Sequence, residues 1–189
     1  MKAAFALLAD YATHNAVRKL AWQMYQNYGI SLETSRLPPH VSLKQPFDIP
    51  NISDLEEYMT ELAGSLSPID ITLTELELIE VTGANGPSGI LWLQVEQTSA
   101  LHKLHTRLNQ ELASRFGNTQ ADFDGPGYQF HMTIAIGGSS LVDSRRAYGD
   151  FKDSWREVRF RADTLALFAY DNISSQPDYI SYKILPIGE

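Results

Sequence analysis

The chain lacks cysteine and any long apolar stretch, and each absence narrows what the protein can be. Without cysteine, a disulfide, a thiolate metal site and a cysteine nucleophile are all excluded. No apolar run approaches the ~18 residues that a membrane-spanning helix needs. The short apolar run near the N-terminus is closed by Asp10, so we interpret it as a first strand and not as a secretion signal. We therefore expect a cytoplasmic protein that does not bind a membrane.

Positive charge is also scarce. The 15 lysines and arginines are outnumbered by 23 aspartates and glutamates, which gives a formal net charge of −8. A protein that grips duplex nucleic acid broadly needs a basic stripe to neutralise phosphates, and none is visible in the sequence. We therefore expect no extended duplex binding. An anionic ligand would have to be small, or held by a locally arranged pocket.

The remaining composition is that of a globular domain, with 43% hydrophobic and 20% charged residues in a chain of 189. Hydrophobic runs and period-two alternation predict strands in residues 2–9, 40–43, 70–81, 90–96, 130–136, 158–169 and 178–185. Helical spacing predicts helices that begin at Thr13, at a capping box on Ser53, at Ser99 and near residue 140. Strands and helices thus alternate along the chain.

Two of the predicted strands share an irregularity. The apolar alternation changes phase after Leu73 in one and after Ala162 in the other. A phase slip in a strand is what a bulge or a bend produces. Because the two slips fall at corresponding places in the element order, we expect one domain (1–189) built from two pseudo-repeats, at about residues 1–85 and 86–189.

A histidine and a hydroxyl recur together at the start of two predicted strands. In PPHVSL, His40 and Ser42 point to the same face, because strand side chains alternate. The pattern returns 91 residues later in HMTI, as His131 and Thr133. The other three histidines have no hydroxyl two residues on. Two accidents in equivalent places are much less probable than one, so the pair indicates a site.

Such a set suits chemistry at phosphorus. Two imidazoles that titrate near neutral pH can act as base and acid, one taking a proton from the nucleophile and the other giving one to the leaving oxygen. Two hydroxyls can donate hydrogen bonds to the nonbridging phosphate oxygens. We therefore expect His40 and His131 to be catalytic and Ser42 and Thr133 to bind phosphate, with no metal and no cofactor.

The paired His-x-Ser/Thr-apolar motifs, with the flank KQPF after the first, resemble the two-histidine phosphoesterase superfamily. This superfamily includes bacterial 2′-5′ RNA ligase-like proteins and 2′,3′-cyclic nucleotide phosphodiesterases. The resemblance implies an α+β fold of two pseudo-symmetric lobes, each of mainly antiparallel sheet with outer helices, around a central cleft. The chain departs from the usual pattern at Ser42, where threonine is commoner, and at Phe130, where a proline often stands.

The resemblance and the residues together predict a monomeric phosphoesterase that hydrolyses a cyclic phosphate, 2′,3′-cyclic or similar, on a nucleotide or RNA end. Ligation to a 2′-5′ bond would be the reverse reaction. One alternative is a module that binds the same ligand without turnover. Another is a metal-dependent hydrolase that uses His102, His105 and acidic residues. The sequence does not decide which histidine of the motifs is acid and which is base.

Further candidates lie close to the motifs. Lys44 falls on the face of Ser42 if the strand continues, where it could contact phosphate, but a solvated lysine fits equally. Tyr128 could stack on a base or pack in the core. His105 falls within a stripe of leucines, which favours a buried, neutral, hydrogen-bonded histidine over a metal ligand. Asp124, in the loop before the second motif, is more typical of a turn residue.

Overall fold

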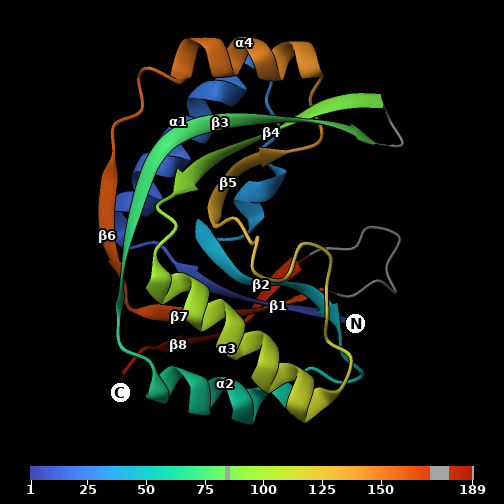
Figure 1. The fold of residues 1–189 in the computed structure, drawn as a ribbon. Helices are drawn as coiled ribbons and strands as arrows, with labels where there is room; N and C mark the ends of the chain where they lie inside the picture. Colours follow the sequence, from blue (N-terminus) through green and yellow to red (C-terminus); the bar gives the residue numbers. More distant parts are fainter. Residues whose placement is uncertain (84–85, 171–178, 189) are drawn as a thin grey trace.

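The computed structural model describes residues 1–83, 86–170 and 179–188. In these residues, two four-stranded antiparallel sheets lie one above the other (Figure 1). One sheet has the order β2-β1-β7-β8 and comprises β1 (Lys2–Leu8), β2 (His40–Asp48), β7 (Thr164–Tyr170) and β8 (Tyr179–Pro186). The other has the order β5-β4-β3-β6 and comprises β3 (Ile69–Gly83), β4 (Gly86–Val95), β5 (His131–Ile136) and β6 (Val158–Ala162).

Helices pack against both sheets. They are α1 (Tyr11–Tyr28), α2 (Asp54–Ser65), α3 (Ser99–Phe116), α4 (Leu141–Phe151) and a short 3-10 helix, η1 (Glu33–Arg36). Helices α2 and α3 contact the β2-β1-β7-β8 sheet and form the first lobe with it. Helices α1 and α4 contact each other and the other sheet, which completes the second lobe. The predicted α+β fold of two antiparallel lobes is confirmed.

The chain crosses repeatedly between the lobes. Strand β3 follows α2 of the first lobe, yet it pairs with β4 and β6 in the second. Strand β7 follows β6 of the second lobe, yet it pairs with β1 and β8 in the first. Neither lobe is therefore a continuous stretch of sequence. The division into pseudo-repeats at about 1–85 and 86–189 stays a prediction.

The two phase slips have different structural causes. After Leu73, strand β3 continues through a register shift, as expected of a bulge, and exchanges β6 for β4 as its partner. After Ala162, the prediction of one strand is wrong: residues 158–162 and 164–170 are two strands in different sheets. Phe160 and Ala162 of β6 are buried and residues 165–169 of β7 are all buried, so the break in the alternation marks where the chain changes sheet.

Three helices begin differently from the sequence prediction. Asp10, and not Thr13, caps α1, with the backbone N–H of Thr13 donating to Asp10 Oδ1 at 2.7 Å. The capping box on Ser53 is wrong, because this residue has helical dihedral angles and its hydroxyl makes no cap bond. Thr98, and not Ser99, caps α3. In α1 and α3, the capping residue lies one to three positions before the predicted one, within the usual uncertainty of a helix boundary.

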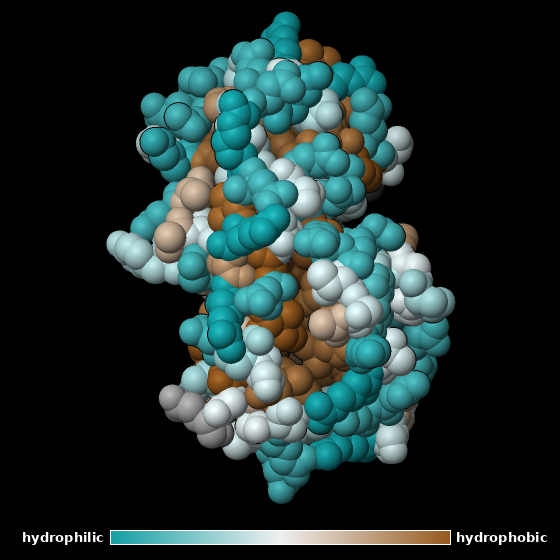
Figure 2. Space-filling view, turned by 60° about the vertical axis from the view of Figure 1, so that its left-hand side comes forward, coloured by the Kyte–Doolittle hydropathy of each residue, from teal (hydrophilic) through white to brown (hydrophobic). Residues whose placement is uncertain are grey.

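Hydrophobic side chains also reach the surface between the lobes. Figure 2 shows apolar atoms gathered over the middle of the molecule, between hydrophilic ends. No helix in the described part of the chain is both long enough and apolar enough to span a membrane.

Candidate active site

The two motif strands face each other across the junction of the lobes. Strand β2 begins at His40 and β5 begins at His131, and the two strands contact each other. In β2, Val41 and Leu43 are fully buried beneath the sheet, so their alternation turns His40 and Ser42 toward the opposite, partly exposed face. The same alternation operates in β5. The apolar residues of each motif thus fix the polar ones in place.

Each histidine is held by the same backbone contact. Nδ1 of His40 lies 2.8 Å from the carbonyl oxygen of Pro38, and Nδ1 of His131 lies 2.9 Å from that of Gln129. A carbonyl oxygen only accepts hydrogen bonds, so Nδ1 must carry the proton in both rings. In the neutral imidazole, Nε2 is then the acceptor. Both rings therefore have the tautomer that a general base acting through Nε2 requires.

The surroundings of His40 disfavour its protonated, positively charged form. Its ring meets Phe168 edge-on, with 4.7 Å between the ring centroids. Burial lowers the pKa of His40 from 6.5 to about 4, and the positive charges of His131 and Arg18 act in the same direction, against the hydrogen bond to Pro38. His40 is thus neutral at neutral pH and able to accept a proton.

His131 has a different environment. Its ring stacks on Trp92, with centroids 4.1 Å apart and planes 23° apart. Burial also lowers the pKa of His131, but the hydrogen bond to Gln129 and the carboxylate of Glu77 both oppose that effect. The two histidines therefore share a backbone contact and differ in their charged neighbours.

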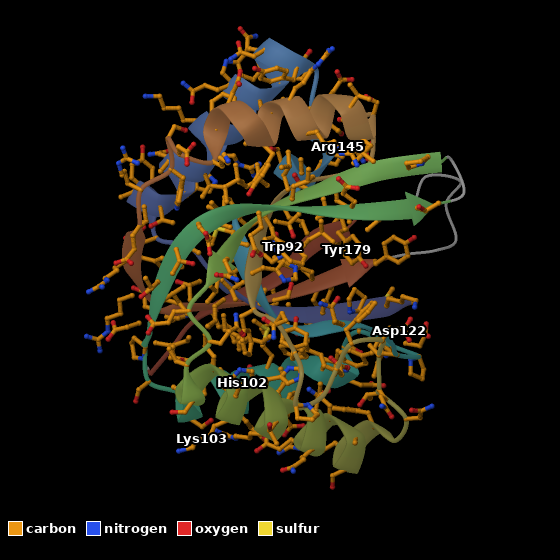
Figure 3. The ribbon with its side chains drawn as sticks, turned by 45° about the horizontal axis from the view of Figure 1, so that its top comes forward. Trp92, His102, Lys103, Asp122, Arg145 and Tyr179 are labelled. Atoms are coloured by element: carbon orange, nitrogen blue, oxygen red, sulfur yellow. The ribbon has the colours of Figure 1, made fainter. Side chains whose placement is uncertain are left out.

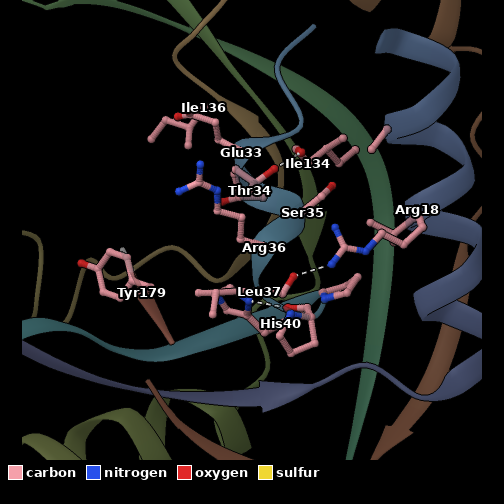
Figure 4. A pocket seen from close by; sticks show the side chains of 15 residues that line it. Arg18, Glu33, Thr34, Ser35, Arg36, Leu37, His40, Ile134, Ile136 and Tyr179 are labelled. Carbon is pink, nitrogen blue, oxygen red and sulfur yellow. Dashed lines mark hydrogen bonds between the residues drawn. The ribbon is translucent and has the colours of Figure 1, made fainter. Parts of the chain in front are cut away.

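A cavity of about 310 Å³ opens beside the motifs. His40 and Thr133 both line it, so the structure brings one residue of each motif to the same space. Ser42 and His131 lie two residues away on the same strands, outside the lining. The other walls come from α1, from η1 with the segment that follows it, from β5 and from Tyr179 of β8 (Figure 4).

Two arginines that sequence reasoning missed also line this cavity. Arg18 reaches in from α1 and donates to the carbonyl oxygen of Leu37 at 2.5 Å, which holds the segment leading into His40 (Figure 4). Arg36 of η1 lies on the opposite side of that segment. Arg36 could have been noticed from its place just before PPH. Nothing local in the sequence shows that Arg18 reaches the site.

The two weaker candidates, Lys44 and Tyr128, are both buried. The Lys44 side chain is fully buried, and its ammonium pairs with the carboxylate of Asp124, so the solvated reading of this lysine is wrong. Tyr128 is buried too: its hydroxyl donates to the carbonyl oxygen of Ser42 at 3.1 Å. Neither is among the residues that line the cavity. Their role as substrate contacts stays a prediction.

His105 is buried and hydrogen-bonded, as its place in the leucine stripe predicts. Its Nδ1 donates to the carbonyl oxygen of Leu43 at 2.8 Å, and its Nε2 accepts from the N–H of Gly125 at 3.2 Å. Both ring nitrogens are thus occupied by backbone atoms, whereas His102 packs edge-on against Phe130. The described residues contain no group of three or more acidic, histidine or cysteine side chains that could hold a metal ion.

The sequence as a whole decides the family. The model of the 2′-5′ RNA ligase superfamily matches residues 11–173, which include both motifs. The chain belongs to this superfamily. The chain is 37% identical over 79 residues to a protein of Geobacillus thermodenitrificans, and 24% identical over 103 residues to a protein of Bacillus licheniformis. Both are named, provisionally, as phosphoesterases.

These matches cover 40% and 52% of this superfamily member, and 42% and 53% of the two relatives, so the chain spans about half of the relatives' length. Solved structures match more completely. The chain is similar to the TT0787 protein of Thermus thermophilus, with a TM-score of 0.63, 13% identity and coverage of 100% and 98% of the two chains. It is also similar to Escherichia coli LigT complexed with 3′-AMP, with a TM-score of 0.55, 15% identity and the same coverage.

Proposed function

We propose that the protein is a metal-independent phosphoesterase that hydrolyses a cyclic phosphate, 2′,3′-cyclic or similar, on a nucleotide or RNA end. The observation that carries the proposal is the matched pair of histidines on β2 and β5. Each ring is fixed through Nδ1 by the carbonyl two residues earlier, which leaves Nε2 as the acceptor. Membership of the superfamily supports the same class of chemistry.

The proposed reaction needs only side chains of this chain. Nε2 of one histidine takes a proton from water as the water oxygen attacks phosphorus. The bond from phosphorus to one ribose oxygen breaks, and the other histidine gives its proton to that oxygen. Ser42 and Thr133 donate hydrogen bonds to the phosphoryl oxygens, where charge accumulates in the transition state. A ribose 5′-hydroxyl in place of water would attack phosphorus in the same way, and with the 3′ oxygen as leaving group the product is a 2′-5′ bond.

The proposed ligand class agrees with what similar structures hold. Escherichia coli LigT has been solved with 3′-AMP, with NADP+ and with ATP, all of them nucleotides. Arg18 and Arg36 place positive charge at the cavity of a chain whose net charge is −8, which favours a small phosphorylated ligand. We further propose that the protein acts as a monomer in the cytoplasm.

The test is an assay of the purified protein against a panel of cyclic phosphates and RNA ends, with and without EDTA. Turnover that survives EDTA and disappears in His40→Ala and His131→Ala supports the proposal. His14→Ala, which alters a histidine outside both motifs, is the matched control and should retain activity. Activity lost with EDTA and restored by one divalent ion would refute metal independence. Binding without turnover would indicate a non-catalytic nucleotide-binding module.

A further inference from the structure

A row of residues crosses the sheet of the second lobe from β3 through β4 to His131 on β5. In the strand register, Glu77 of β3 stands opposite Trp92 of β4, and Trp92 stands opposite Thr133 of β5. On the next rung, Gln94 stands opposite His131. Because alternate residues of a strand share a face, the side chains of Trp92 and Gln94 lie on one surface with those of the second motif. Figure 3 labels Trp92, which is half-buried, near the middle of the view.

These side chains form a continuous chain of contacts that ends at His131. The indole N–H of Trp92 donates to Oε2 of Glu77 at 2.7 Å, and Nε2 of Gln94 donates to Oε1 at 3.2 Å. Both carboxylate oxygens are thus bonded, so Glu77 is fixed and the indole plane is fixed with it. The face of that indole lies against the imidazole of His131.

This arrangement favours a positively charged His131. The face of an aromatic ring attracts a cation, and tryptophan does so most strongly. A carboxylate nearby stabilises the charged form of an imidazole in the same way. An imidazolium at this position is therefore stabilised both by the Trp92 indole and by the Glu77 carboxylate, which orients that indole.

Among the residues that the structure describes, no carboxylate acts on His40 as Glu77 acts on His131. The charged groups that act on it are Arg18 from α1 and His131 from β5, and both are cationic. The ring that it contacts, Phe168 of β7, meets it edge-on. The same cavity is also lined by one acidic group, one basic group and one phenol, which belong to Glu33 and Arg36 of η1 and to Tyr179 of β8.

We propose that Glu77 and Trp92 are positioning residues that make His131 the proton donor and leave His40 to take the proton from the nucleophile. This inference rests on the proposed function, because it assigns roles within that reaction. In the hydrolytic direction, His40 Nε2 removes a proton from water as the oxygen–phosphorus bond forms. His131 gives its proton to the ribose oxygen whose bond to phosphorus breaks, and both histidines then exchange protons with solvent.

The assignment also makes the active protonation state of the histidine pair the more populated one. When the base has the lower pKa of the pair, the form with a neutral base and a protonated acid is the major one between the two pKa values. The environments described above lead to this order, since burial lowers the pKa of both rings and only that of His131 is raised by a carboxylate.

The first experiment is an NMR titration of the histidine Cε1–H resonances, which reports each pKa without turnover. In the wild type, the pKa of His131 should exceed that of His40. Glu77→Gln should lower the pKa of His131 by about one, a shift typical of losing a nearby charge, and leave that of His40 unchanged. Glu75→Gln, an exposed glutamate on the same strand, is the matched control and should move neither.

The second experiment is the dependence of kcat/KM on pH for the same variants. The alkaline limb reports the acid, so Glu77→Gln should move that limb to lower pH and leave the acidic limb in place. Trp92→Phe, which keeps a ring and loses the N–H, should move it in the same direction by less than Trp92→Leu. A purely structural role would lower the melting temperature and the amplitude without moving a limb.

The outcomes separate the two proposals. If the wild type hydrolyses no cyclic phosphate, the proposed function fails, and the titration still decides whether Glu77 and Trp92 set the order of the two histidines. If turnover is present but the pKa of His40 exceeds that of His131, or if Glu77→Gln shifts the acidic limb, the assignment of acid and base is overturned.

Discussion

Replacing Lys44 with methionine measures the cost of breaking the buried ion pair that joins β2 to the loop before β5. The side chains of Lys44 and Asp124 are 0% and 4% exposed. Without the ammonium, the carboxylate would stay buried and uncompensated, and its Oδ1 already has no hydrogen-bond partner in the described residues. Removing one partner of such a pair costs about 3–5 kcal/mol, so the free energy of unfolding should fall by about that amount.

The double variant Lys44→Met/Asp124→Asn measures the coupling energy between the two side chains, apart from the effect of each substitution alone. The asparagine oxygen can still accept the N–H of Ala121, which donates to Asp124 at 2.9 Å. With neither charge present, no ion is left buried alone, so the double variant should lose at least about 2 kcal/mol less than the sum of the single variants. Urea denaturation gives the free energy of unfolding of the wild type, the two single variants and the double variant. Equal m-values would confirm that all four proteins expose the same surface on unfolding.

The matched control is Arg145→Met, which breaks the bidentate pair between Arg145 and Glu80 at 2.7 and 2.8 Å. That pair is exposed, so water and salt screen it, and the urea midpoint should barely change. Additive losses at Lys44 and Asp124, within about 0.5 kcal/mol, would refute the energetic coupling. A loss at Lys44 no larger than at Arg145 would refute the argument from burial.

Three further outcomes are expected. His40→Ala and His131→Ala should each lower kcat by about 10²–10⁴-fold, and a folded variant with normal turnover would remove that histidine from the mechanism. The pKa of His40 is about 4 in the folded protein and 6.5 as its ordinary value, so the folded state binds fewer protons than the unfolded state between these pH values. The free energy of unfolding, measured by urea denaturation at each pH, should therefore fall as the pH drops from 6.5 to 4, and it should fall less in His40→Gln. Gly89→Ala should lower the melting temperature, since a Cβ there would lie 2.6 Å from Cβ of Ser144 on α4, whereas Gly149→Ala, with open space around it, should raise it; equal shifts would contradict this.

Local patterns were sufficient to predict the motifs. Strand alternation placed His40 with Ser42, and His131 with Thr133, on the polar face, and helical spacing buried His105. These inferences depend only on the period of each element, which neighbouring residues determine.

Features that depend on distant partners could not be predicted in this way. Lys44 is buried because Asp124, 80 residues later, supplies the opposite charge. The change of sheet at Asp163 looks like a bulge in the sequence, since both leave the same break in the alternation. The contact of Arg18 with Leu37 depends on how α1 packs across the lobes, which no local pattern records.

The crossing of the chain between lobes sets the order in which the protein can assemble as it is synthesised. The sheet of the second lobe is complete once β6 has emerged from the ribosome, whereas β1 must wait for β7. At about 5–20 residues per second, the strands of the first lobe spend on the order of 10 seconds without their central partner. Such distant pairing slows folding and leaves a strand edge exposed to other chains in the meantime. The sheet that carries His40 is therefore completed late, after the sheet that carries His131.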